Sequence, residues 1–169
     1  WRLLIEISIA VSCSMMRVPN IPLSYQDEDV GTLQIGNSEV GEINVSADLD
    51  AGFFAVTNGH TTMQIRMGQK EYELVPNLQI YGPDGVRVTN DFPSDYRSEI
   101  TSLLTNNGIY TIVCSDKFNA KGSYALTLVL IPGGISGADM DIGTIISAEK
   151  KTGTINEPGD LDLASYNAV

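Results

Sequence analysis

The chain has 169 residues, a length that suits one domain with appendages rather than several complete domains. Its formal net charge of −11 argues against a nucleic-acid-binding surface and suits an acidic extracellular surface or one that gathers divalent cations. No apolar stretch is long enough to predict a membrane-spanning helix. The two cysteines, Cys13 and Cys114, are too few for a disulfide framework; they could pair, although we favour small buried hydrophobic residues.

The first predicted element is a β-strand over residues 3–14. Ile5, Ile7, Ile9 and Val11 alternate there with polar or small residues, which is the two-residue period of a half-buried strand. A targeting helix is the alternative, because this N-terminal stretch is apolar overall. We predict that the four apolar side chains form an interface with a neighbouring module.

Short strands follow a connector with two prolines at residues 18–26, and Gly, Asn and Pro mark the joints between them. The predicted strands cover residues 31–35, 40–46, 53–57, 61–67, 78–81, 86–89, 97–104, 109–114 and 124–131. Apolar residues recur at every second position nearly throughout, so no helix is predicted. The pattern predicts the all-β class, as an antiparallel β-sandwich whose two sheets pack face to face.

The same alternation predicts which residues fill the core. We expect Ile43 and Val45 to face the same side of one strand, and the polar residues 68–73 to form a loop. The predicted core consists of Leu33, Ile43, Phe54, Val56, Ile65, Leu78, Ile80, Val86, Val88, Ile100, Tyr110, Ile112, Cys114, Leu126 and Leu128.

One stretch of the sequence occurs twice, since residues 27–57 align with residues 139–169 without a gap at an offset of 112 positions. The identical residues are Asp27, Asp29, Gly31, Thr32, Gly41, Ile43, Asn44, Asp48, Leu49 and Asp50, matched by Asp139, Asp141, Gly143, Thr144, Gly153, Ile155, Asn156, Asp160, Leu161 and Asp162. An internal repeat outranks other sequence signals of fold, although chance similarity between two strand–turn–strand segments is the alternative. We therefore predict tandem modules, one beginning near Asp27 and one near Asp139.

The repeat divides the chain into four predicted parts. Residues 1–18 are a strand of a preceding or neighbouring module, residues 19–30 a linker, residues 31–134 a complete sandwich, and residues 139–169 the start of a second, incomplete module. Half a sandwich exposes apolar faces and unpaired strand edges. We expect the ends to be truncated members of a tandem array or strands exchanged between subunits by strand addition.

Acidic residues mark the start of each copy. Residues two apart on an extended chain point to the same side, so each Asp-x-Asp pair aims two carboxylates at one point. Such carboxylates are ligands that calcium prefers, and calcium is the predicted cofactor. The alternative is that these aspartates form turns by accepting hydrogen bonds from their own backbone. The candidate ligands are Asp27, Glu28, Asp29, Asp48, Asp50, Asp139, Asp141, Asp160 and Asp162.

No catalytic site is predicted. His60 is the only histidine, it lies beside the Asn58-Gly59 turn, and no nucleophile motif surrounds any serine. Several aromatic residues in or near loops could stack on sugars or hold a partner, although they are also ordinary residues at the edge of a sandwich. These residues are Tyr25, Tyr72, Tyr81, Tyr96 and Phe118.

Three groups of residues resemble, in order, the bacterial pre-peptidase C-terminal domain family. They are Gly41-Glu42-Ile43 with Asp48-Leu49-Asp50 and Phe53-Phe54, then residues 78–91 as a central hairpin, then residues 108–130 as a closing pair of strands. The second copy has the Glu-Pro-Gly of the family pattern at residues 157–159, where the first copy departs from it with Val45-Ser46-Ala47. The resemblance implies a secreted, jelly-roll-like β-sandwich that is not itself catalytic and occurs beside proteases or in tandem arrays. It also implies calcium and a fibrous or polysaccharide ligand for some relatives.

The leading prediction is therefore a non-catalytic structural or adhesive module of an extracellular filament or of a tandem-repeat cell-surface protein. Its predicted partners are neighbouring copies of the same module, with no nucleic acid and no membrane span. The alternative is an accessory domain of a secreted hydrolase, which binds a polysaccharide or matrix ligand and depends on calcium.

Overall fold

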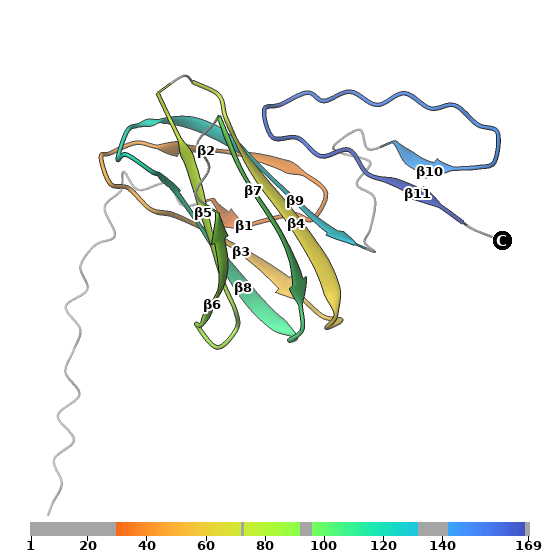
Figure 1. Cartoon of the computed structure of the whole chain (residues 1–169), viewed down its shortest axis with the longest axis horizontal. Coiled ribbons are helices and arrows are strands. Elements are labelled where there is room, and N and C mark those ends of the chain that lie inside the picture. Colours follow the sequence, from red (N-terminus) through yellow and green to blue (C-terminus); the bar gives the residue numbers. More distant parts are fainter. Residues whose placement is uncertain (1–29, 72, 92–95, 132–141, 168–169) are drawn as a thin grey trace, which may run out of the picture.

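The computed structural model describes residues 30–71, 73–91, 96–131 and 142–167, and these fold into strands without a helix (Figure 1). One sheet of the described part has five strands in the order β1 (Gly31–Thr32), β3 (Asp50–Val56), β8 (Gly108–Asp116), β5 (Pro76–Tyr81) and β6 (Arg87–Asp91). The other has four, in the order β2 (Ser38–Ile43), β9 (Gly122–Ile131), β4 (Thr61–Gln69) and β7 (Arg97–Leu104). A separate pair consists of β10 (Gly143–Ile145) and β11 (Ala164–Tyr166).

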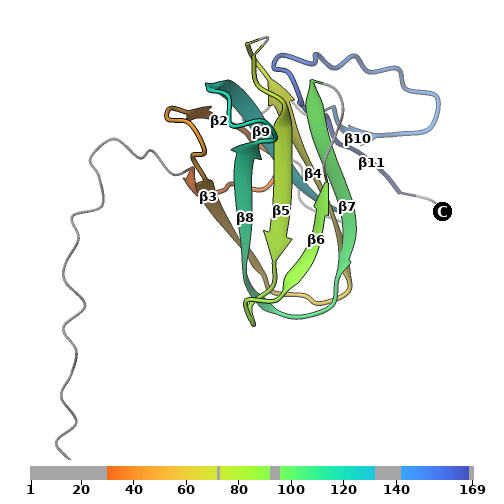
Figure 2. The ribbon, with the colours of Figure 1, turned by 60° about the vertical axis from the view of Figure 1, so that its left-hand side comes forward.

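The two larger sheets face each other as a β-sandwich, which confirms the predicted fold class (Figure 2). Alternate side chains of both sheets point into one core, where Ile80 and Ile112 from one sheet and Ile65 and Leu126 from the other are almost fully buried. Each such side chain contributes about 1.5–3 kcal/mol by leaving water. The core thereby holds the two sheets together.

The core prediction is wrong at two residues, Val86 and Val88. Val86 is 63 % exposed because it lies in the turn before β6, and Val88 is 41 % exposed because β6 is the edge strand of the five-stranded sheet. The register between β5 and β6 also shifts at Ile80 and Tyr81, so the alternation does not continue through the hairpin. Val45 was expected beside Ile43, but it follows β2 in a turn and is 50 % exposed.

Other core residues were not predicted. Residues 68–73 were expected to form a loop, whereas β4 continues to Gln69 and Leu74 is fully buried just beyond. The other members of the core cluster that the prediction left out are Met63, Met67, Leu104 and Tyr124. Met63 and Met67 follow the alternation of β4, and the flexible methionine side chain fills the space between the sheets.

Both copies of the repeat open with the same backbone geometry at the offset of 112 positions. In the first copy β1 pairs with β3 in parallel, and in the second β10 pairs with β11 in parallel. The matching pairs are Gly31 with Gly52 and Thr32 with Phe53, then Gly143 with Ala164 and Thr144 with Ser165. Positive φ angles recur at Gly31 and Gly143, at Gly36 and Ala148, and at Ala47 and Gly159. The predicted N-terminal strand, with Ile5, Ile7, Ile9 and Val11, lies outside the described residues.

Candidate functional site

The first aspartate of each described Asp-x-Asp pair closes the same kind of turn. In the first copy Asp48 Oδ2 accepts a hydrogen bond from the Asn44 amide at 3.1 Å, and Asp48 Oδ1 accepts one from the Leu49 amide at 3.0 Å. In the second copy Asp160 Oδ2 accepts one from the Asn156 amide at 3.0 Å. Asp48 and Asp160 therefore accept hydrogen bonds from backbone amides, as aspartates in turns do.

The second aspartate of the first pair lies in the core. Asp50 begins β3 and is fully buried, and its Oδ2 accepts a 2.5 Å hydrogen bond from the hydroxyl of Tyr124 on β9. The phenol ring lies against Gly41 of β2, where an added Cβ would overlap it. Burial, then the nearby Cys114 and Asp50, raises the pKa of Tyr124, and burial likewise raises the pKa of Cys114. Both groups are therefore neutral in the folded protein at neutral pH.

Calcium stays a prediction. Five of the candidate ligands, namely Asp27, Glu28, Asp29, Asp139 and Asp141, lie outside the described residues. In the part of the chain that the structure describes, no group of three or more His, Cys, Asp or Glu side chains is placed to hold a metal ion. Asp162 faces Gly153, as an added Cβ at Gly153 would overlap its carboxylate. A calcium site at the described pairs would need oxygen ligands in addition to their carboxylates.

Part of the outer face of the four-stranded sheet, over β4 and β9, is covered. Met67 of β4 points into the sandwich, so its neighbours Arg66 and Gly68 point outward. Ala125 and Thr127 of β9 pair with Gly68 and Arg66 in the ladder and face outward as well, yet both are fully buried. Outward side chains on a central strand are buried in this way when another segment lies over the sheet.

That segment is the second copy, which lies beside the sheet of β4 and β9 in both views (Figures 1 and 2). Arg66 Nη1 donates a 3.1 Å hydrogen bond to the carbonyl oxygen of Asp160, and Ser38 Oγ donates a 3.4 Å bond to Asp160 Oδ1. Lys70 Nζ forms a 2.9 Å ion pair with Glu157. We call this contact the junction. It consists of Ser38, Arg66 and Gly68 on the sheet, Lys70 just after β4, and residues 157–160 of the second copy.

Two glycines lie at the centre of the junction. A Cβ added at Gly68 would be 2.5 Å from the Gly159 nitrogen and would overlap the backbone of Pro158. A Cβ added at Gly159 would be 2.7 Å from the Gly68 nitrogen. The absence of side chains at both positions lets the two backbones approach to contact.

Arg66 is held in place by Glu99 of β7. Its Nε and Nη2 lie 2.8 and 2.6 Å from Glu99 Oε2, and Gln64 Nε2 donates a 3.1 Å bond to Glu99 Oε1. Partial burial opposes the charged form of Glu99, but the hydrogen bond and charge of Arg66 outweigh it, so the pKa of Glu99 is lowered. The guanidinium that bonds the second copy is therefore oriented by the neighbouring strand.

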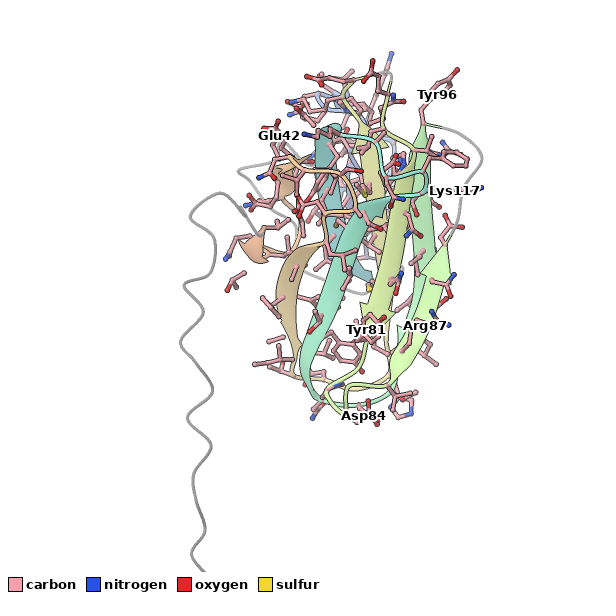
Figure 3. The ribbon with its side chains drawn as sticks, turned by 90° about the vertical axis from the view of Figure 1, so that its left-hand side faces the viewer. Glu42, Tyr81, Asp84, Arg87, Tyr96 and Lys117 are labelled. Atoms are coloured by element: carbon pink, nitrogen blue, oxygen red, sulfur yellow. The ribbon has the colours of Figure 1, made fainter. Side chains whose placement is uncertain are left out.

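A cavity of about 520 Å³ lies beside the junction and is lined by Gln69, Lys70, Glu71, Tyr96 and Pro158. Tyr96 is 68 % exposed, and it projects from the end of the sandwich opposite to the Asp84 turn (Figure 3). Of the other aromatic candidates, Tyr81 donates a hydrogen bond to Gln79, Phe118 is 70 % exposed, and Tyr25 and Tyr72 lie outside the described residues. Tyr96 is thus the candidate that stands next to a cavity.

His60 stands apart from the other candidate residues. It is exposed in the turn between β3 and β4, where its backbone has a positive φ of 65° and its amide donates to the Leu104 carbonyl at 2.7 Å. No helix within the described ranges is long and apolar enough to span a membrane.

The junction was not predicted, although the sequence carries a sign of it. Residues 125–130 of β9 form the run Ala-Leu-Thr-Leu-Val-Leu, which does not alternate between apolar and polar residues. A strand buried on both faces reads as such a run, whereas a strand at the surface alternates. The run therefore indicated that something covers the outer face of β9.

No family model matches the sequence, and no curated protein matches it. Several solved structures are similar to it, and two of them are described here. The pre-peptidase C-terminal domain of a collagenase from Bacillus anthracis is 13 % identical with a TM-score of 0.49, and the match covers 60 % of this chain and 96 % of that one. A periplasmic lysozyme inhibitor of g-type lysozyme from Aeromonas hydrophila is 13 % identical with a TM-score of 0.44, covering 61 % and 99 %. At these values nothing about the chain's function follows from either likeness.

Proposed function

We propose that the chain is a non-catalytic structural module of an extracellular filament or tandem-repeat cell-surface protein, in which successive sandwiches touch through the junction. The observation that carries this proposal is the seating of residues 157–160 on β4, with backbone contact at Gly68 and polar contacts on either side. A sheet face that receives the opening of the next copy is suited to head-to-tail repetition, because each unit then contacts its neighbours.

The equivalence of the two openings supports the proposal. Parallel pairing, positive φ angles and the aspartate-closed turn recur at the same offset, so the second copy begins as the first one does. The proposed partners are therefore neighbouring copies of this sandwich. The exchange of the strand with Ile5, Ile7, Ile9 and Val11 between neighbours remains a prediction of the same hypothesis.

Electron microscopy of the native protein tests this function. We expect elongated particles or fibres in which globular units repeat at a regular spacing, because the junction fixes each unit against the next. Images taken with and without a calcium chelator show whether calcium contributes to that order. Isolated globular particles at every concentration would contradict the proposal.

A second candidate function is an accessory domain that binds a polysaccharide or matrix ligand. It is favoured by the cavity beside the junction, where exposed Tyr96 lies with the polar side chains of Gln69, Lys70 and Glu71. Aromatic faces stack on sugars, and flanking polar groups fix their orientation.

Pull-down with cellulose, chitin and fibrous collagen tests this second function. We expect Tyr96→Ala to abolish retention by whichever of these binds the chain. Phe118→Ala is the matched control, because Phe118 is as exposed as Tyr96 but does not line the cavity. The second function is wrong if none of the three materials retains the chain, or if both variants are retained as the parent is.

A further inference from the structure

We propose that the junction selects its partner by sequence, so that it accepts the turn of residues 157–160 and rejects the corresponding turn of the first copy at residues 45–48. This inference rests on the proposed function, because it concerns which opening follows which sandwich in an array. The partner is defined by its chemistry as an acidic turn that reads Glu-Pro-Gly-Asp, carried by another copy of the sandwich.

The two turns present nearly the same backbone. Ala47 and Gly159 occupy equivalent positions with φ angles of 67° and 91°, and the aspartate that follows each of them accepts an amide hydrogen bond of 3.1 or 3.0 Å. The Asp48 amide donates to Val45 and the Asp160 amide to Glu157, at 3.3 and 3.1 Å. Backbone shape therefore gives the junction no means of telling the turns apart.

One side chain does tell them apart. At Gly159 a Cβ would be 2.7 Å from the nitrogen and 3.1 Å from the Cα of Gly68, and both of these are backbone atoms of a central strand. Ala47 carries such a Cβ at the equivalent place in the first turn. Since β4 is paired on both sides, it cannot move away from the added methyl group without breaking ladder hydrogen bonds.

The charges at the junction also favour the turn of residues 157–160 over the turn of residues 45–48. Lys70 forms its 2.9 Å ion pair with Glu157, and the first turn has Val45 at that position. Arg66 bonds the main-chain carbonyl of Asp160, so its contact does not depend on the side chain of the turn. The selectivity therefore comes from Gly68 and Lys70, while Arg66 supplies affinity for either turn.

A junction with this selectivity joins copies through the second opening only. The first opening has the same fold as the second but does not fit the site that the second occupies. Copies of the chain therefore do not attach to a neighbour's β4 through residues 45–48. The turn of residues 157–160 is the one that seats, on its own sandwich or on that of another copy.

Hydrogen–deuterium exchange on the full chain tests the selection. The triple variant Glu157→Val, Pro158→Ser and Gly159→Ala gives the second opening the turn of the first copy. We expect the amides of residues 157–162 to exchange about tenfold faster or more, because a methyl group forced against backbone removes the contact. Gly68→Ala leaves the turn unchanged and alters only the sheet, and it should cause the same loss.

Two further variants control for effects on folding. Ala47→Gly makes the same kind of change in the turn that does not seat, and it should leave the exchange of residues 157–162 as in the parent. Lys70→Glu should speed that exchange, and adding Glu157→Lys should restore it. The selection is wrong if the triple variant and Gly68→Ala both keep the parent's protection. If the parent itself shows no protection at residues 157–162, the proposed function loses the contact that carries it, which is a different outcome.

Discussion

The hydroxyl of Tyr124 on β9 donates a 2.5 Å hydrogen bond to Asp50 on β3, and this bond crosses the core from one sheet to the other. The carboxylate and the phenol are both buried, so each depends on the other for a polar contact that water would otherwise supply. Gly41 makes room for the ring, whereas its counterpart in the second copy, Gly153, lies against the carboxylate of Asp162.

Tyr124→Phe is expected to destabilise the sandwich by about 2 kcal/mol, because it takes a charged acceptor's hydrogen bond away inside the core. The free energy of unfolding in urea measures the loss. Tyr110→Phe is the matched control, since the Tyr110 hydroxyl donates to the neutral carbonyl of Asn106 at 3.0 Å. Its loss should be smaller, at about 1 kcal/mol. Equal losses would mean that the hydrogen bond of Tyr124 to Asp50 stabilises the fold no more than that of Tyr110 to a neutral carbonyl.

The protein is expected to lose stability at alkaline pH. The raised pKa values of Cys114 and Tyr124 mean that the unfolded chain releases these protons first, near the ordinary values of 9.0 and 10.0. Stability is therefore fully present below about pH 9 and falls above it, by about 1.4 kcal/mol per pH unit for each group. Urea unfolding between pH 7 and pH 11 measures the slope. Cys114→Ala should remove the part that begins near pH 9, and an unchanged slope would contradict this assignment.

Gly41→Ala is expected to destabilise the sandwich by about 1–3 kcal/mol, because the new methyl group overlaps the Tyr124 ring. Thermal unfolding measures the loss. In the background of Tyr124→Val the ring is absent, so the same change at Gly41 should then cost little. Additive losses in this double-mutant cycle would show that the ring is not what requires glycine.

The burial seen in the structure predicts a large loss of stability at one residue of the β5–β6 hairpin and a small loss at another. Ile80→Ala should cost about 2–5 kcal/mol, because Ile80 is fully buried on β5. Val88→Ala should cost about 0.5 kcal/mol or less, because Val88 is exposed on the edge strand β6. Chemical denaturation of both variants compares them directly, and a large loss at Val88 would restore it to the core.

The variant Asp48→Ala distinguishes the hydrogen-bonding role of Asp48 in its turn from a role in binding calcium. Loss of the acceptor for the Asn44 and Leu49 amides should cost about 1–2 kcal/mol, and it should do so in chelator as well as in calcium. If calcium binds at Asp48 and Asp50, the variant loses more in calcium than in chelator, because the parent then gains binding free energy. Differential scanning calorimetry measures the loss of stability in the chelator buffer and in the calcium buffer.

Alternation in the sequence was enough to predict the sandwich, and it placed Ile65, Leu78 and Ile112 in the core correctly. It failed at Val88, because a period of two does not show that a strand lies at the edge of its sheet, and at Val86, because the strand begins one residue later than predicted. Tyr124 follows the same alternation as Leu126 and Leu128 but was left out of the predicted core, and its hydrogen bond to Asp50 across the core could not be predicted. Such pairings are long-range and leave no local pattern.

The junction was harder to predict for the same reason. The repeat located Asp160 and its turn, but no spacing in the sequence connects residues 157–160 with Gly68 on a strand ninety positions earlier. A glycine in a strand indicates close approach of another backbone, but the sequence analysis placed Gly68 in a loop, so this indication was missed. What approaches it, and from which side, follows only from the arrangement of the two copies in space.

The junction also determines which part of the protein would separate first under tension. In the proposed array, a pull along the chain would load one ion pair and a few hydrogen bonds at residues 157–160, whereas the sandwich is held by full ladders between neighbouring strands. The turn would therefore peel away and reseat before any sheet came apart. An assembly of such units would stretch reversibly at its seams and protect each folded body from rupture.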